Sequence, residues 1–241
     1  MDTVVETARP GPLVSVVIPT RQEAATIDRC LSGLMRNTGP FEIIVSDAGG
    51  CRETVERARA FAGVRVAGAA PGRAHQMNQG AGLARGEILW FLHADCRPPA
   101  DAVLRIQQTL ADPTVAAGAF RFAIDSPRRA YRVIELGARI RSEWLKTPYG
   151  DQGLFLRRDL FFALGGFPAV SRMEDLYLLR KLRRHGRIAV VQVPLPTSPR
   201  RWERSGIIRT TLRNWTWVLS DWISPRPTRP SMSTHPTGGT R

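Results

Sequence analysis

The sequence predicts an α/β protein with a mostly parallel central sheet, and three observations lead to this fold class. Short apolar, β-branched runs alternate along the chain with segments whose apolar residues recur at helical spacing. The apolar runs are continuous, which is typical of strands that helices bury on both faces. The length of 241 residues suits one domain with an appendage. Sheets of this kind bind ligands at the carboxyl ends of their strands.

The expected elements follow one another in an alternating order. Strands are expected over 13–18, 41–46, 63–67, 87–92, 116–124, 151–157 and 187–193. Helices are expected over 23–35, 51–61, 74–84, 100–110, 128–145 and 174–185, with another between 158 and 164. We expect a disordered leader over 1–12, a domain over 13–199 and a disordered tail over 226–241. Residues 200–225 are predicted to form a basic, Trp-rich helical extension, amphipathic over 207–223.

Positive charge is concentrated at one end of the chain. The formal net charge is +14. Residues 1–175 hold 22 basic and 19 acidic residues, whereas residues 176–241 hold 13 basic and 2 acidic ones. A protein built to bind nucleic acid would carry this charge on its body and show a recognised binding motif, and neither feature is present. The basic end has two interpretations: its helix packs on the body, or it lies on an anionic membrane surface.

Cysteine usage and hydropathy bear on the compartment. Cys30, Cys51 and Cys96 are odd in number and lack a CxxC spacing, so we expect reduced thiols without a disulfide framework. The N-terminus shows no signal-peptide pattern, and the apolar run at 88–92 is far shorter than the roughly twenty residues of a membrane span. These features predict a cytoplasmic protein, free or attached to the inner face of the cell membrane.

Acidic side chains stand where predicted strands end or helices begin, at Glu23, Asp47, Asp95 and the pair Glu174–Asp175. A carboxylate at the mouth of an apolar strand favours a role in ligand binding. Two structural interpretations stay open. Asp47 is suited to cap the following helix, and Glu174–Asp175 suits a helix N-terminus, where the dipole favours negative charge.

Six motifs in order identify a resemblance. They are PTRQE (19–23), SDAGG (46–50), GRAHQMNQGAGLARGEILWFLHAD (72–95), GDQGLFLRR (150–158), GGF (165–167) and MEDLYLLRKLRRHG (173–186). This series, spread over about residues 13–222, resembles glycosyltransferase family 2. Within the family it is most similar to the small branch associated with radical-SAM and selenodomain proteins, also described as arsenosugar-biosynthesis glycosyltransferases. The resemblance implies the GT-A fold, a nucleotide-sugar-binding α/β sandwich.

The resemblance also implies a donor site. Pro19, Thr20, Glu23 and Asp47 would hold the base and ribose, and Arg73 and His93 would approach the donor. Asp95 would be the second carboxylate of an Asp-x-Asp motif and would bind Mn²⁺ or Mg²⁺. His93 departs from the pattern, because many relatives have Asp at the first position of that motif. His93 either contacts ribose or phosphate, or simply ends the strand as a polar residue.

The acceptor side follows from the same resemblance. Asp175 is the expected general base, with Glu174 beside it, and a single base suggests inversion at the anomeric carbon. Asp151 and Gln152, expected on a strand at the same mouth, would orient donor or acceptor. The pair Arg201–Trp202 resembles an Arg-Trp motif that some processive members place near the acceptor.

The sequence therefore predicts an inverting glycosyltransferase. It would move a sugar from a nucleotide-diphosphate sugar, such as a UDP-sugar, to a hydroxyl or carboxyl of a small-molecule or lipid acceptor. One alternative is a sugar-phosphate nucleotidyltransferase, which would need a Gly-rich phosphate loop after the first strand, where this chain has residues 19–23 instead. The other is a basic protein that binds nucleic acid or an anionic membrane.

Overall fold

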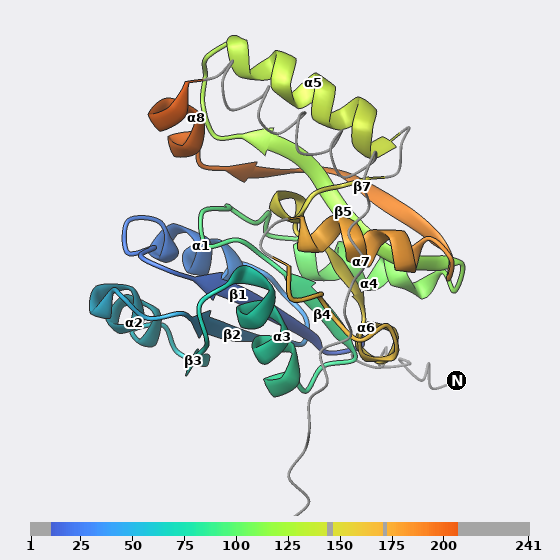
Figure 1. Cartoon of the computed structure of the whole chain (residues 1–241), viewed down its shortest axis with the longest axis horizontal. Helices are drawn as coiled ribbons and strands as arrows, with labels where there is room; N and C mark the ends of the chain where they lie inside the picture. Colours follow the sequence, from blue (N-terminus) through green and yellow to red (C-terminus); the bar gives the residue numbers. More distant parts are fainter. Residues whose placement is uncertain (1–10, 144–146, 171–172, 207–241) are drawn as a thin grey trace, which may run out of the picture.

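A seven-stranded sheet in the order β3-β2-β1-β4-β6-β5-β7 organises the protein (Figure 1). This computed structural model describes residues 11–143, 147–170 and 173–206. Its strands are β1 Val14–Thr20, β2 Phe41–Asp47, β3 Val64–Gly68, β4 Ile88–Phe91, β5 Val115–Ile124, β6 Phe155–Arg157 and β7 Arg187–Thr197. The strands pair in parallel except β6, which is antiparallel to both β4 and β5. The predicted mostly parallel α/β sheet is confirmed.

Helices cover both faces of this sheet. They are α1 Ile27–Leu34, α2 Arg52–Arg59, α3 Arg73–Leu83, α4 Ala102–Ala111, α5 Ala130–Glu143, α6 Arg158–Ala163, α7 Glu174–Leu182 and α8 Arg200–Ser205. A first apolar cluster joins α1, α2 and α4 to one face of the sheet, and a second joins α3, α6 and α7 to the other. The period-two geometry of strands sends neighbouring residues to opposite faces. Accordingly Val16 packs in the first cluster and Val17 in the second.

The strand β1 lies between the two directions in which the sheet extends: β2 and β3 follow on one side of it and β4 on the other. It pairs with β2 over its whole length and with β4 from Val14 to Val17. The order of the strands therefore reverses at β1, and a crevice opens between the loops that follow β1 and β4.

A smaller layer lies at one end of the molecule, where α5 and α8 sit over the far ends of β5 and β7 (Figure 1). Phe122, Ile124, Tyr131 and Trp202 form its apolar cluster. The ring centroid of Trp202 lies 6.0 Å from that of Phe122 and 6.4 Å from that of Tyr131. The start of the predicted C-terminal extension thus packs on the body.

The prediction of one strand over 151–157 was partly wrong. Residues Gly150–Gln152 form a turn of 3₁₀ helix, η1, and only Phe155–Arg157 join the sheet. The cause is local, because Gly153 adopts a left-handed conformation with φ of 64° and Gln152 Oε1 accepts a hydrogen bond from the Tyr149 N–H. Both features close a turn instead of extending a strand.

The last strand is longer than predicted, since β7 continues through Pro194 and Pro196 to Thr197. It is the edge strand of the sheet, and proline is tolerated where one side of a strand needs no hydrogen-bond donor. The predicted amphipathic helix over 207–223 and tail over 226–241 lie outside the described residues, as does the leader up to residue 10. Within the described ranges, no helix combines the length and hydropathy needed to cross a bilayer.

The core should not tolerate a methyl group on Gly118 of β5. A Cβ there would lie 2.3 Å from Cζ of the buried Phe155 ring. We expect Gly118→Ala to lower the free energy of unfolding by about 2–3 kcal/mol, measured by urea denaturation. Gly82→Ala in α3 is the control, because nothing lies within 4 Å of that Cβ. It should raise stability by about 0.5–1 kcal/mol. Equal midpoints for Gly118→Ala and wild type would contradict this packing.

Candidate functional site

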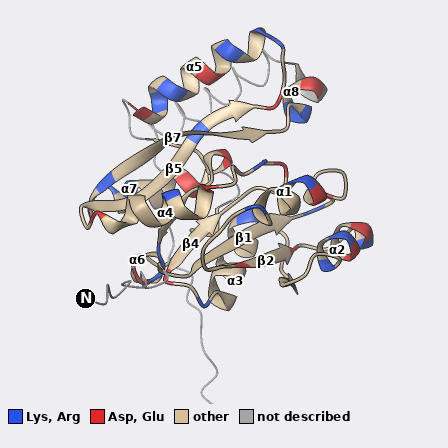
Figure 2. Ribbon diagram, turned by 180° about the vertical axis from the view of Figure 1, so that it is seen from behind, with Lys and Arg blue, Asp and Glu red and all other residues tan. Residues whose placement is uncertain are grey.

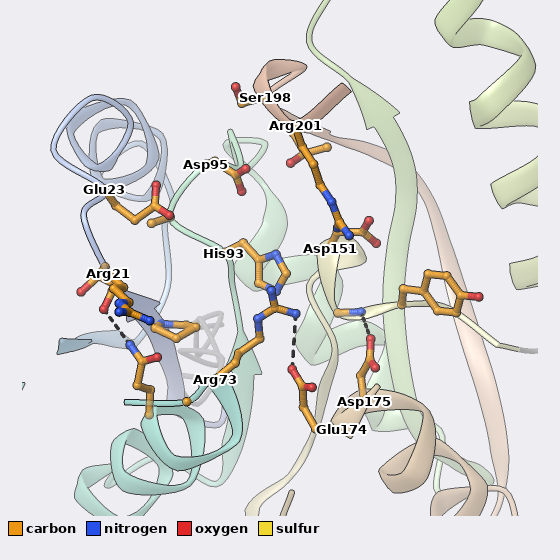
Figure 3. Close-up of a pocket in the computed structure, with 18 of the residues that line it drawn as sticks. Arg21, Glu23, Arg73, His93, Asp95, Asp151, Glu174, Asp175, Ser198 and Arg201 are labelled. Carbon is orange, nitrogen blue, oxygen red and sulfur yellow. Dashed lines mark hydrogen bonds and ion pairs between the residues drawn. The ribbon is translucent and has the colours of Figure 1, made fainter. Parts of the chain in front are cut away.

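A pocket of about 880 Å³ opens where the strand order reverses, between the loops that follow β1 and β4. Its other walls come from the N-termini of α3 and α7, from η1 and from α8. Figure 3 shows Glu23 and Arg21 on one side, Asp151, Asp175 and Arg201 on the other, and His93 and Arg73 between them. Its lining includes most predicted site residues: Pro19, Thr20, Glu23, Arg73, His93, Asp95, Asp151, Glu174, Asp175, Arg201 and Trp202.

Asp47 and Gln76 hold the strand ends beneath the pocket. The Thr20 hydroxyl donates to Asp47 Oδ1 at 2.8 Å, and the Gly49 N–H donates to Oδ2 at 2.8 Å. Gln76 Nε2 donates to the carbonyls of Thr20 and Ser46, at 2.7 and 3.0 Å. Asp47 is buried and is absent from the lining. It does not cap the next helix, whose N-cap is Cys51.

An ion pair joins the two ends of the described chain across the pocket. Arg200 of α8 donates to Glu23 Oε2, which also accepts a hydrogen bond from the Thr26 hydroxyl. Sequence reasoning named Glu23 and missed Arg200, although Arg200 directly precedes the Arg-Trp pair. The carboxylate of Glu23 is thus fixed in direction by a cation from a distant helix.

His93 and Asp95 follow β4 at the floor of the pocket. His93 Nε2 is buried and makes no hydrogen bond with the described residues. Burial, reinforced by Arg73 and Arg201, lowers the pKa of His93 to about 3, so the imidazole is neutral near pH 7. Burial also raises the pKa of Asp95, which Arg200 opposes. A neutral imidazole and a half-buried carboxylate therefore lie two residues apart.

Asp151 is a half-buried carboxylate on the opposite wall, and its Oδ1 is buried. Its Oδ1 has no hydrogen-bond partner among the described residues, and Figure 3 shows Arg201 pointing toward its side chain. Burial raises the pKa of Asp151 to about 6, with Arg141 opposing this shift. Arg141 of α5 stacks over the Tyr149 ring at 3.2 Å from its centroid and donates to the Thr147 carbonyl at 2.5 Å. Sequence reasoning missed Tyr149, which lines the pocket.

Gln152 is turned away from the pocket. Its Nε2 donates to the Phe120 carbonyl at 2.9 Å, and its Oε1 accepts from the Ser142 hydroxyl at 2.8 Å. These bonds fix η1 against β5 and α5. The structure therefore brings Asp151 into the lining and leaves Gln152 behind it.

Glu174 and Asp175 open α7 and face different partners. Asp175 Oδ2 accepts the Gly150 N–H at 2.5 Å and Oδ1 accepts the Leu176 N–H at 2.9 Å, so the carboxylate direction is fixed. Glu174 Oε1 pairs with Arg73 Nη1 at 3.3 Å. Burial and the charge of Asp175 raise the pKa of Glu174, and Arg73 opposes them.

Two residues with strained backbone conformations line the pocket. Gln22 and Met173 have positive φ of 59° and 62°, and both line the pocket. Non-glycine residues in this region cost of order 1 kcal/mol, and such strain concentrates at functional sites. Met173 is the residue before the first turn of α7, so its backbone conformation determines how Glu174 and Asp175 enter the pocket. No sequence pattern signals either conformation.

The pocket combines charges of both signs. Among the described residues, four arginines line it, Arg21, Arg73, Arg200 and Arg201, together with five carboxylates, Glu23, Asp95, Asp151, Glu174 and Asp175. The described residues contain no group of three or more His, Cys, Asp or Glu side chains that could hold a metal ion. One carboxylate with phosphate oxygens can nevertheless hold Mg²⁺ or a similar hard cation. The residues present therefore fit a cation that binds together with a phosphorylated ligand.

Comparison with known proteins identifies the family. Residues 15–176 match the model of glycosyl transferase family 2, and the chain belongs to this family. A PGL/p-HBAD biosynthesis glycosyltransferase of Mycobacterium bovis is 38% identical over 92 residues, which cover 35% of this chain and 36% of that protein. Protein MT1568 of Mycobacterium tuberculosis is 27% identical over 262 residues, covering 90% of this chain and 79% of the relative.

Solved structures confirm the predicted fold class. Mannosyltransferase PcManGT from Pyrobaculum calidifontis, in complex with GDP-Man and Mn²⁺, superposes with a TM-score of 0.64 and 26% identity. The match covers 77% of this chain and 56% of the mannosyltransferase. Glucosyl-3-phosphoglycerate synthase from Mycobacterium tuberculosis, with Mn²⁺, UDP and glucosyl-3-phosphoglycerate, gives 0.59 and 22%, covering 76% and 71%. The chain thus spans about a third of the first curated relative and just over half of PcManGT.

The half-buried carboxyl of Asp151 should make stability depend on pH. Its pKa rises from 3.8 to about 6 on folding, so its stabilising contribution is complete below about pH 3.8 and is lost as pH rises through about 6. Asp151→Asn cannot ionise and should escape this loss. Relative to wild type, its free energy of unfolding should rise by about 2–3 kcal/mol between pH 4 and 7. Urea denaturation at several pH values measures this difference, and a difference that stays constant with pH would contradict the assignment.

Proposed function

We propose that this protein transfers a sugar from a nucleotide-diphosphate sugar to an acceptor hydroxyl or carboxyl, with inversion at the anomeric carbon. The observation that carries the proposal is the meeting of Asp95 and Asp175 in one pocket at the point where the strand order reverses. Membership of glycosyl transferase family 2 and the GDP-Man held by the mannosyltransferase neighbour support this reaction class.

The donor is proposed to lie along the carboxyl ends of β1 and β4. Pro19 and Thr20 would contact the base and ribose, and Asp47 would support them from below through its bond with Thr20. The diphosphate would lie near Arg73, the first residue of α3, because the N–H groups at a helix N-terminus favour anions. The Nε2 of His93, which has no hydrogen-bond partner among the described residues, would form a hydrogen bond with a hydroxyl of the donor.

A divalent cation is proposed at Asp95, completed by oxygens of the donor diphosphate. Mn²⁺ in the complex of the mannosyltransferase supports this choice of ion. When bound, the ion would neutralise the charge that develops on the leaving diphosphate. The arginines of the lining give the same site a further source of positive charge.

Asp175 is proposed as the general base. The acceptor oxygen forms a bond to the anomeric carbon, while the bond from that carbon to the diphosphate oxygen breaks and its electron pair leaves with the diphosphate. The acceptor proton passes to the Asp175 carboxylate. The hydrogen bond from the Gly150 N–H holds this carboxylate in one direction before the acceptor arrives. Glu174 is less suited, because Arg73 already pairs with it.

The acceptor is proposed to enter beside Asp151, Tyr149 and Arg201. Oδ1 of Asp151, which has no hydrogen-bond partner among the described residues, is suited to accept a hydrogen bond from a hydroxyl of the donor sugar or of the acceptor molecule. The acceptor would be a small molecule or a lipid, and the six motifs favour the arsenosugar branch as one source. Trp202 would form part of the apolar wall of the acceptor site, because it lines the pocket and packs on Phe122.

The donor proposal predicts a calorimetric signal. Purified protein should bind a UDP- or GDP-sugar, and Mn²⁺ or Mg²⁺ should strengthen the binding, since a cation shields the diphosphate from nearby carboxylates. In Asp95→Asn the metal effect should vanish. Titration calorimetry measures both effects. Absence of heat with UDP-, GDP- and TDP-sugars, in either the presence or absence of metal, would exclude this donor class. Turnover of a nucleoside triphosphate with a sugar phosphate would instead indicate a nucleotidyltransferase.

If Asp175 is the general base, its substitution should affect sugar transfer much more than donor binding. Asp175→Asn keeps an oxygen for the Gly150 N–H, so donor binding should persist, while transfer should fall by about 10²–10⁴-fold. Transfer is measured as product mass in a screen of donors and acceptors. Glu174→Gln is the matched control and should lose less. If Glu174→Gln abolished transfer while Asp175→Asn retained it, Glu174 would be the base.

A further inference from the structure

The outer side of α5 carries an exposed apolar stripe. Val133, Leu136 and Ile140 are 73%, 57% and 50% exposed. Their spacing of three and four residues places them on one side of the helix. Single exposed apolar residues are ordinary, but three in a row along one helix form a continuous patch of the kind that marks an interaction surface.

Arginines accompany this stripe, and the nearby carboxylates are turned inward. Arg128, Arg129, Arg132 and Arg139 are exposed on α5 or just before it. By contrast, the side chains of Glu135 and Glu143 are only 16% and 23% exposed. Glu135 Oε1 accepts the Ile124 N–H at 2.7 Å, which keeps it against the sheet. Figure 2 shows basic residues along α5, with acidic residues between and beside them. Both carboxylates pair with arginines of the same helix, Glu135 with Arg132 at 2.9 Å and Glu143 with Arg139 at 3.1 Å. The outer surface is therefore apolar in its middle, and its uncompensated positive charge lies at the exposed Arg128 and Arg129, just before the helix.

The inner side of α5 is fixed to the body and to the wall of the pocket. Tyr131 is fully buried, and Ile134 and Ala138 pack against the same apolar cluster. At the other end, Arg141 stacks over Tyr149, which lines the pocket. These contacts use the inner side, so within the described part of the chain the outer side can meet a partner without any unfolding of the helix.

We propose that the outer surface of α5, defined by Arg128, Arg129, Val133, Leu136 and Ile140, binds an anionic lipid surface. The helix would lie in the plane of the membrane, with the apolar stripe at the boundary of the acyl chains and the arginines at the headgroups. Charge complementarity selects this partner. A second copy of the same surface would offer Arg128 and Arg129 no cluster of free carboxylates, because Glu135 and Glu143 are already paired with Arg132 and Arg139. This inference does not depend on the proposed sugar transfer.

The test uses the full chain and sedimentation with vesicles of phosphatidylcholine, alone or mixed with phosphatidylglycerol. The protein should bind the mixed vesicles and not the neutral ones. Val133→Gln/Leu136→Gln/Ile140→Gln should weaken binding by about tenfold or more. Arg128→Gln/Arg129→Gln should weaken it by about fivefold for each arginine removed. Light scattering should show the same monomer mass for all forms.

Matched controls lie elsewhere on the surface. Leu104→Gln changes a leucine that is 47% exposed on α4, and Arg52→Gln changes an arginine whose side chain is 90% exposed on α2. Both should bind mixed vesicles like wild type, and thermal melts should show that every variant is folded. The proposal is overturned if wild type ignores mixed vesicles, or if the α5 variants bind them as wild type does. It is equally overturned if wild type is a dimer that the apolar variant makes monomeric.

Discussion

The position of β1 between β2 and β4 is the constraint on which the site depends. Because β1 is paired on both sides, the chain that leaves it must turn out of the sheet, and so must the chain that leaves β4. These two exits place Glu23 and Asp95 at one crevice. The remaining walls, from α7, η1 and α8, are added to a geometry that β1 already determines.

The pocket partly buries its ionisable groups and balances them against one another. Burial raises the pKa of Asp95, Asp151 and Glu174, while arginines oppose each of these shifts. Burial acts in the opposite sense on His93, whose neutral form it favours. The result is a set of directed oxygens and nitrogens whose net charge is nearly balanced. Such a set suits a ligand that itself carries both negative phosphates and neutral hydroxyls.

Most of the fold, and many of the residues that line the candidate pocket, were predictable from the sequence for a physical reason. Continuous apolar runs predict strands that are buried on both faces. Carboxylates directly after such runs indicate the carboxyl ends of the strands, where ligands bind. What the sequence left hidden depends on tertiary contact. Gln152 sits beside Asp151 in the chain, yet its amide is satisfied by Phe120 and Ser142. Arg200 belongs to the site only because β7 returns it to Glu23. The left-handed conformation of Met173 likewise has no local signature.

The pair between Arg200 and Glu23 joins residues 177 positions apart, and this has a consequence for the order of folding. The strands β1 to β4 pair mostly among themselves and can assemble as soon as they leave the ribosome, since N-terminal regions emerge first. The pair must wait until β7 has been made and laid beside β5. Long-range closures of this kind are entropically costly and form late. The wall of the pocket that α8 supplies therefore depends on the part of the chain that is synthesised last among the described residues.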